Sequence, residues 1–324
     1  MPLDPARFFA ASRLVIVAGK GGVGKTVVSA TLARAASRVG LSSLIVEVEG
    51  KSGLPTMFGQ RALEYEGVLL HPGGGPDGEG EVRARTITPD QALLDYLETH
   101  GLSRISKRLV SSGALDVVAT AAPGIKDILI LGKVKQLERD GVADLVILDA
   151  PAAGHAITFL QSARALLDAV RVGPINTQAR EVLEMLTDHE RCRVILVTLP
   201  EETPVNELVE TAFNLEDRVG IGLAPVVVNG VYDRVPGLDA DPPVAAAEAG
   251  TTLRDGEATA LADAARFRQD RMALQDEQVA RLAERLPLEQ IRLPFVFTTD
   301  IGPEELDALA DRLLAAVEAL PEVV

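Results

Sequence analysis

The chain has 324 residues, of which 47% are hydrophobic, and this length and composition suffice for one large α/β domain. Its formal net charge is −15, so its surface repels phosphate backbones and anionic lipid headgroups, which argues against nucleic acids and membrane surfaces as partners. The single cysteine, Cys192, excludes an internal disulfide framework. Because the first residues lack the apolar core of a signal peptide and no apolar run is long enough to span a membrane, we expect a cytoplasmic protein without stable membrane insertion.

Short apolar runs rich in β-branched residues alternate along the chain with amphipathic patterns of helical period. The expected strands are residues 13–19, 42–49, 82–87, 144–150, 193–199, 224–230 and 291–297. Most of these runs are apolar throughout, which is typical of a parallel sheet covered on both faces. Helical patterns include residues 26–39, 179–188 and 303–320. The alternation predicts a doubly wound, mostly parallel α/β sheet.

Two regions exceed a minimal sheet of this kind. Residues 90–142 carry helical patterns without a strand pattern, which predicts a helical subdomain inserted after the third strand. Residues 234–288 begin as an acidic, Ala/Pro-rich segment and continue as a long helix from about Glu257 to Leu286, which predicts a second, mostly helical insertion. Neither region looks like an independent unit, so we expect residues 1–324 to form a single domain.

The segment GKGGVGKT, residues 19–26, fits the pattern G-x-x-x-x-G-K-[ST] and joins an apolar strand to a helical pattern. Its glycines allow backbone N–H groups to surround phosphate oxygens, and the start of the helix adds the positive end of its dipole. Lys25 would reach the outer phosphates, and Thr26 would ligate Mg²⁺. The motif therefore predicts a P-loop that binds ATP or ADP with Mg²⁺. The expected nucleotide contacts are Gly21, Gly22, Val23, Gly24, Lys25, Thr26 and Val27.

A second lysine, Lys20, lies inside the same loop. A loop that folds around phosphates points its second residue outward, away from its own nucleotide. One interpretation is that Lys20 serves a nucleotide bound by a facing subunit. The simpler interpretation is a solvated surface lysine.

The loop GKGGVGKT is similar to the deviant Walker A motif of the SIMIBI-class P-loop ATPases. Together with the second strand and the segment DAPAAGH, residues 149–155, it most resembles the family of arsenite-pump (anion-transporting) ATPases and tail-anchored-protein targeting ATPases. The resemblance covers nearly the whole chain. It implies a Mg²⁺-dependent ATPase that works as a dimeric switch, in which nucleotide-driven closure is coupled to a protein client. It also implies that Lys20 acts in trans, on the nucleotide of the partner subunit.

The resemblance implies further site residues at the ends of other strands. Asp149 ends a segment that looks like the family's Walker B strand, where it would hold Mg²⁺ through water. Asn229 ends a segment that looks like the strand with an adenine-reading asparagine, and Pro294 and Phe295 match the loop that packs against the base. From the residues alone, Asp149 is also explained as a helix N-cap or a surface loop residue, and Asn229 as a turn residue before Gly230.

The segment VEVEGKSG, residues 46–53, departs from the family pattern. Switch I of the family begins with Asp-Pro-Ala-His, and Glu49 stands where the water-orienting Asp belongs. Glu is longer by one methylene, and a displacement of about 1 Å can cost about 100-fold in rate, so we expect slow hydrolysis by this chain alone. The variant resembles a sub-branch of actinobacterial homologues that occur as paired, non-identical ATPases. The residues expected to take part in hydrolysis are Lys20, Lys25, Glu49 and Asp149.

This departure leaves two functions open. The first is an active ATPase that couples its cycle to a hydrophobic protein client. The second is a weakly hydrolysing or non-hydrolysing nucleotide-binding subunit of a heterodimer, in which a paired homologous ATPase supplies the chemistry. The partner is accordingly a second copy of the chain or a homologous chain.

Two features of tail-anchor targeting ATPases bear on partners and metals. Those proteins carry a Cys-x-x-Cys that shares zinc across the dimer. Its place would lie just before the helix at residues 267–282, where this chain has no cysteine, and Cys192 alone cannot ligate zinc, so we expect no zinc. Their inserted helical subdomain forms a groove for the client, which would correspond to residues 90–142. The simpler interpretation, which we favour, is that the apolar residues of this region pack internally.

Overall fold

The structure is a computed structural model of the chain. It describes residues 3–48, 53–60, 63, 65–75, 78–99, 101, 124–151 and 153–321, with the backbone alone at 153–155. The strands are β1 (Leu14–Gly19), β2 (Ser43–Val48), β3 (Val68–His71), β4 (Val82–Ile87), β5 (Leu145–Asp149), β6 (Cys192–Thr198), β7 (Gly222–Leu223), β8 (Val226–Val231) and β9 (Gln290–Pro294). They form one sheet in the order β3-β4-β2-β5-β1-β6-β8-β9, with β7 paired to β6. Only the β3–β4 pair among them is antiparallel.

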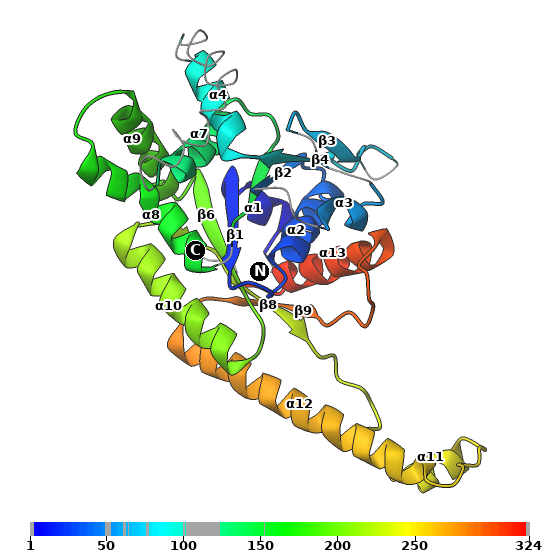
Figure 1. Cartoon of the computed structure of the whole chain (residues 1–324). Helices are drawn as coiled ribbons and strands as arrows, with labels where there is room; N and C mark the ends of the chain where they lie inside the picture. Colours follow the sequence, from blue (N-terminus) through cyan, green and yellow to red (C-terminus); the bar gives the residue numbers. More distant parts are fainter. Residues whose placement is uncertain are drawn as a thin grey trace.

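Helices cover both faces of this sheet (Figure 1). The helices are α1 (Pro5–Ala10), α2 (Lys25–Arg38), α3 (Leu54–Met57), α4 (Pro89–Thr99), α7 (Ile125–Arg139), α8 (Ala153–Ala169), α9 (Pro174–Thr187), α10 (Glu202–Arg218), α11 (Pro242–Glu248), α12 (Glu257–Arg285) and α13 (Pro303–Glu318). Helices α4, α7, α8, α9 and α10 pack on one face, and α1, α2, α3 and α13 pack on the other. This arrangement confirms the doubly wound, mostly parallel α/β sheet.

The central strands are largely apolar because each of their faces is covered. In β2, Val46 packs in the cluster with α7 and α8, whereas Ile45 packs in the cluster with α2 and α13. Neighbouring residues of a strand point to opposite faces, so polar and apolar residues do not alternate along a strand that is buried on both sides. This is why these strands were recognisable as apolar runs.

Two expectations about strands are corrected by the structure. Residues 68–71 form β3, which was not expected, so the inserted helical segment that begins with α4 follows the fourth strand and not the third. β3 is a short strand at the edge of the sheet, and its Leu69 is 41% exposed. It therefore lacks the continuous apolar pattern of a buried strand. The strand expected over 291–297 ends at Pro294, and Phe297 is 72% exposed beyond it.

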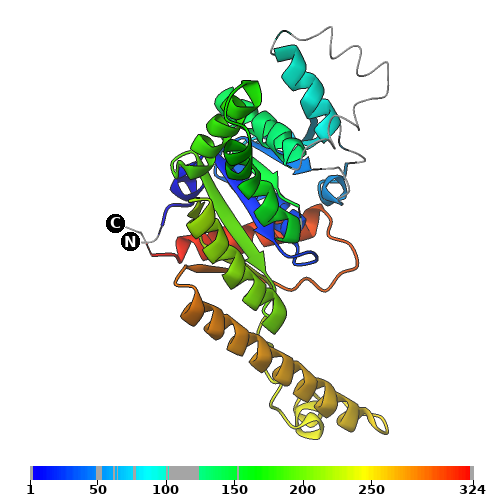
Figure 2. The same cartoon turned by 60° about the vertical axis from the view of Figure 1, so that its left-hand side comes forward.

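The second insertion contains α11 and α12, which together we call the arm. Helix α12 is 29 residues long and projects from the sheet and its covering helices, with α11 at the far end (Figures 1 and 2). Its buried residues, Gln275, Val279 and Leu282, all lie toward its C-terminal end. The arm is therefore attached to the sheet by one end of α12. Among the helices that the structure describes, none combines the length and the apolar content that crossing a membrane would require.

Candidate nucleotide site

The phosphate loop lies at the carboxyl edge of the sheet, between the end of β1 and the start of α2 (Figure 1). Ligands of doubly wound folds bind at this edge. Gly24 forms the N-cap of α2 with φ at 89°, a left-handed conformation that favours glycine. A Cβ atom at Gly19 would lie 2.3 Å from the carbonyl oxygen of Val197 on β6, so the loop also begins at a position where only glycine fits.

Lys25 is folded back over its own loop. Its Nζ donates a hydrogen bond to the carbonyl oxygen of Lys20 at 3.1 Å. Burial lowers the pKa of the Lys25 ammonium, and the carboxylate of Asp149 partly offsets this effect. The ammonium thus lies inside the curve of the loop, where phosphate oxygens would replace the carbonyl as its partner.

Thr26 and Asp149 are in direct contact beneath the loop. The Thr26 hydroxyl donates to Oδ2 of Asp149 at 2.6 Å, and Asp149 is only 8% exposed. Burial raises the pKa of the Asp149 carboxyl, against the opposing effects of the Thr26 hydroxyl and the Lys25 ammonium. Oδ1 of Asp149 has no hydrogen-bond partner among the described residues.

These oxygens fit a magnesium ion. Mg²⁺ prefers hydroxyl, carboxylate and water oxygens, and it is usually held by one or two protein groups together with phosphates. Thr26 supplies a hydroxyl, and Asp149 supplies a buried carboxylate whose Oδ1 has no hydrogen-bond partner within the part of the chain that the structure describes. The donor set expected from the sequence is therefore brought together at one point.

Lys20 points away from the loop that contains it. Its Nζ donates to Oε1 of Glu207, in α10, at 2.7 Å. Both side chains are partly exposed, at 39% and 41%. Within this single chain, Lys20 thus pairs with a carboxylate and not with the site formed by Lys25 and Thr26.

The residues expected at the adenine lie at the ends of β8 and β9. Nδ2 of Asn229 donates to the carbonyl oxygen of Val23 in the phosphate loop at 2.9 Å. Pro294 ends β9, and the ring of Phe295 packs edge-on against Tyr232, with 5.2 Å between ring centroids. Phe295 is 44% exposed, which leaves part of its ring open for contact.

One expected site residue cannot be located. Glu49 and the residues up to 52 lie outside the described ranges, as do residues 102–123 of the inserted helical segment. The roles of Glu49 and of a client groove accordingly stay predictions from sequence.

Two residues near the site were missed in the sequence. Gln275 in α12 binds the backbone of β8 on both sides of its end, because its Nε2 donates to Gly230 O at 3.1 Å and its Oε1 accepts from Tyr232 N at 2.8 Å. Nothing in an amphipathic helix marks such a glutamine. Glu47 is a buried acid that follows three apolar residues in β2, and this irregularity is a signal in the sequence that points to the site.

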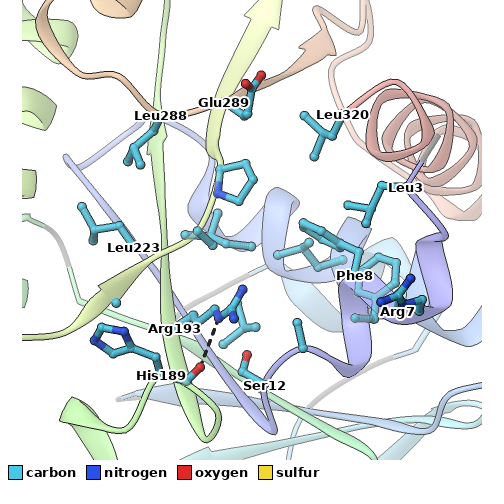
Figure 3. A pocket seen from close by; sticks show the side chains of 18 of the residues that line it. Leu3, Arg7, Phe8, Ser12, His189, Arg193, Leu223, Leu288, Glu289 and Leu320 are labelled. Atoms are coloured by element: carbon cyan, nitrogen blue, oxygen red, sulfur yellow. Dashed lines mark hydrogen bonds between the residues drawn. The ribbon is translucent and has the colours of Figure 1, made fainter. Parts of the chain in front are cut away.

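A large cavity of about 770 Å³ lies elsewhere, at the amino edge of the sheet (Figure 3). Its lining includes Phe8 of α1, Arg193 near the start of β6, Leu288 and Leu320. The strands begin here, and the phosphate loop follows the opposite end of β1. This cavity is therefore separate from the candidate nucleotide site.

Residues 12–172, which include the phosphate loop and Asp149, match the family model described as anion-transporting ATPase. Over 224 residues, the chain is 32% identical to the ATPase BagA of Mycobacterium tuberculosis. The chain belongs to the anion-transporting ATPase family. The alignment with BagA covers 67% of this chain and 64% of BagA, so the chain spans less than two thirds of that relative.

Other relatives in the anion-transporting ATPase family are more distant. The chain is 27% identical over 237 residues to a Halobacterium salinarum protein described as an arsenical pump-driving ATPase, which covers 67% of this chain and 35% of that protein. It is 27% identical over 200 residues to the ATPase get3 of Neurospora crassa, which covers 61% of this chain and 55% of get3. These names agree with the resemblance derived from the phosphate loop.

Proposed function

We propose that this chain is an ATP-binding, Mg²⁺-dependent ATPase that works as a dimeric switch. The observation that carries the proposal is the convergence of Lys25, Thr26 and Asp149 beneath a glycine loop at the start of α2. This convergence supplies an ammonium, a hydroxyl and a carboxylate at a helix N-terminus, which are the groups that a nucleoside triphosphate and its cation need.

In this proposal the loop residues hold ATP as follows. Backbone N–H groups from Gly21 to Val27 surround the phosphates, and Lys25 exchanges the Lys20 carbonyl for phosphate oxygens. Thr26 and Asp149 hold Mg²⁺, which would neutralise charge on the outer phosphates. Asn229, Pro294 and Phe295 hold the adenine.

The proposed working unit contains two subunits. Lys20 points away from its own loop, which supports a role for its ammonium on the nucleotide of a facing subunit. In a single chain Glu207 neutralises this lysine instead. The partner is a second copy or a homologous ATPase, and closure of the pair on ATP is coupled to a protein client.

The described part of the inserted helical segment favours internal packing of its apolar residues. Leu93 and Leu97 of α4 and Ile128 and Leu131 of α7 are all buried. A groove for a hydrophobic client stays a prediction from sequence, because residues 102–123 lie outside the described ranges.

A second candidate function is favoured by Glu49. With this residue in place of the family's Asp, the chain would bind ATP but hydrolyse it weakly or not at all, and a paired homologous ATPase would supply the chemistry. The two functions share the nucleotide site and differ in turnover and partner.

Calorimetric titration with ATP in the presence of Mg²⁺ tests the site. Wild-type protein is expected to bind, and Lys25→Ala is expected to lose binding because the only loop ammonium near the phosphates is removed. Lys20→Ala is the matched control, since it removes a lysine of the same loop that points away. Equal ATP affinity in wild type and Lys25→Ala would refute the proposal.

Phosphate release and oligomeric mass, measured on the purified chain with ATP and Mg²⁺, separate the two functions. Slow release that falls further in Glu49→Gln supports an ATPase in which Glu49 orients water. No release above background from wild-type protein, with ATP still bound, supports the non-hydrolysing subunit. Robust release that is unchanged in Glu49→Gln would show that Glu49 does not orient the water.

A further inference from the structure

Glu47 is a buried acid beside the Thr26–Asp149 pair. It lies one residue before the end of β2 and is only 5% exposed. In the parallel pairing of β2 with β5, Glu47 is the register partner of Asp149. Strands in a sheet lie about 4.8 Å apart, so the two acids are immediate neighbours at the carboxyl edge.

Both side chains point to the same face of the sheet. Ile45 of β2 and Ile147 of β5 pack in the cluster that contains α2. Each lies two residues before its acid, and residues two apart in a strand share a face. Glu47 and Asp149 therefore face α2, whose first turn carries Thr26, the donor to Asp149.

The contacts on either side place Glu47 in a row of polar groups. Oε2 of Glu47 accepts from the hydroxyl of Thr86, its register partner on β4, at 3.4 Å. Thr86, Glu47 and Asp149 thus follow one another across three strands. Elsewhere on this face the same strands carry apolar residues such as Val82, Ile45 and Ile147.

A second buried carboxylate next to Asp149 calls for a cation. Like charges at this separation repel each other, and burial of a carboxylate is costly unless a positive charge or hydrogen bonds compensate it. A separate observation points to the same ligand: Oδ1 of the nine-tenths-buried Asp149 has no hydrogen-bond partner among the described residues.

We infer that Glu47 is a positioning residue for the divalent cation of this nucleotide site. Its carboxylate accepts hydrogen bonds from water bound to the ion, alongside Asp149, and Thr86 orients it. The inference rests on the proposed function, because the ion arrives with the nucleotide. It assigns a role to an acid of β2 that is separate from the one expected for Glu49.

The test is the Mg²⁺ concentration at which ATP binding by the purified full chain is half-saturated, followed with a fluorescent ATP analogue. Removal of a residue that supports a metal through its bound groups typically weakens metal binding by about 10- to 100-fold. Glu47→Gln is therefore expected to raise the half-saturating Mg²⁺ concentration by about 10-fold or more, while analogue binding in the presence of EDTA does not weaken. Glu138→Gln is the matched control, since Glu138 is equally buried but pairs with Arg191 at the other edge of the sheet.

The outcomes separate this inference from the proposed function. If wild type does not bind the analogue at all, both fail. If wild type binds with Mg²⁺ and folded Glu47→Gln has the same half-saturating concentration, only the role of Glu47 is overturned. Glu47→Asp keeps the charge but withdraws it by one methylene, so it should give an intermediate value. If Glu47→Gln does not fold, Glu47→Asp is the only test variant. The same half-saturating Mg²⁺ concentration in Glu47→Asp and wild type then overturns the inference.

Discussion

The side-chain amide of Asn229 donates a hydrogen bond to the carbonyl oxygen of Val23 at 2.9 Å and so joins the end of β8 to the phosphate loop. The neighbouring Gly24 leaves no space for a side chain there, because a Cβ atom would lie 2.2 Å from Nδ2 of Asn229. The adenine end and the phosphate end of the proposed site are therefore in direct contact before any nucleotide binds.

Asn229→Ala is expected to weaken ATP binding by about 10-fold, the equivalent of one lost hydrogen bond of about 1.4 kcal/mol. The ratio of ATP to GTP affinity should fall as well, because the proposed adenine contact is lost. Calorimetry with both nucleotides measures these changes. Asn214→Ala removes an amide that bonds to the Glu210 carbonyl in the same helix and should change neither affinity. Unchanged ATP affinity in a folded Asn229→Ala protein would contradict the assignment.

Lys20→Ala is expected to leave ATP affinity of the single chain nearly unchanged and to weaken ATP-driven dimer closure. Loss of a charge-assisted contact to phosphate in a water-poor interface typically costs about 1.5–3 kcal/mol. Stability should change little, because the Lys20–Glu207 pair is partly exposed and such pairs contribute about 0–1 kcal/mol. Light scattering with ATP and Mg²⁺ reports the dimer.

Mixing variants decides between action in cis and in trans. Lys20→Ala protein combined with Lys25→Ala protein should regain activity at one site, because each contributes its intact lysine to the same nucleotide. If the natural partner is a homologous chain, the mixture must contain that chain. No recovery in any mixture, with both variants folded, would leave Lys20 as a surface charge paired with Glu207.

Gln275→Leu is expected to lower the free energy of unfolding by about 2–3 kcal/mol, because it leaves the Gly230 carbonyl and the Tyr232 N–H without their partner. Urea unfolding measures the change. The exposed Gln269 of the same helix donates one hydrogen bond to the Leu238 carbonyl, and Gln269→Leu should cost less than about 0.5 kcal/mol. Equal effects of the two substitutions would show that the two hydrogen bonds of Gln275 do not anchor α12.

Stability should depend on pH through Glu79. Hydrogen bonds from Arg34, and then from His71, lower the pKa of the Glu79 carboxyl below its ordinary value of 4.5. A carboxyl whose pKa is lower in the folded state stabilises it above the unfolded pKa and loses this effect as the pH falls through the folded pKa. Glu79→Gln is therefore expected to cost about 1–2 kcal/mol near pH 7 and progressively less below about pH 4.5.

Urea unfolding of wild type and Glu79→Gln over this pH range measures the difference. Glu81→Gln, which removes a more exposed carboxylate paired with Arg83, should show a smaller effect at every pH. A difference between wild type and Glu79→Gln that grows as the pH falls would reverse the expected sign.

The central sheet was predictable from sequence because burial on both faces removes the alternation of polar residues. β1, β5 and β6 each lie between two strands and under helices on both sides, and their apolar runs match the observed strands within one residue at each end. β3 was not predicted because it is an edge strand of four residues, which forms by pairing with β4 and has no distinctive sequence pattern of its own.

The site was predictable only where one short motif carries the information. Lys25 and Thr26 follow from the phosphate loop, and Asp149 was implied by the resemblance of its strand to the family's Walker B segment. The bond between Lys20 and Glu207 joins residues 187 positions apart, and that between Gln275 and Tyr232 spans 43. Such pairs depend on how α10 and α12 pack, which no local pattern encodes.

The attachment of α12 at one end makes this helix a lever. The stretch from Glu257 to Gln275 has no buried residue before Gln275, and at 1.5 Å per residue it is about 27 Å long. Partly exposed contacts, such as that of Arg268 with the ring of Tyr232, lie along it in the part nearest Gln275. Gln275 is hydrogen-bonded to the same end of β8 that carries Asn229. A small rotation of this strand end on nucleotide binding would therefore rotate α12 as well. A rotation of about 5° at Gln275 would move the far end by roughly 2 Å. Binding of the adenine would thereby displace the N-terminal end of α12, far from the nucleotide site.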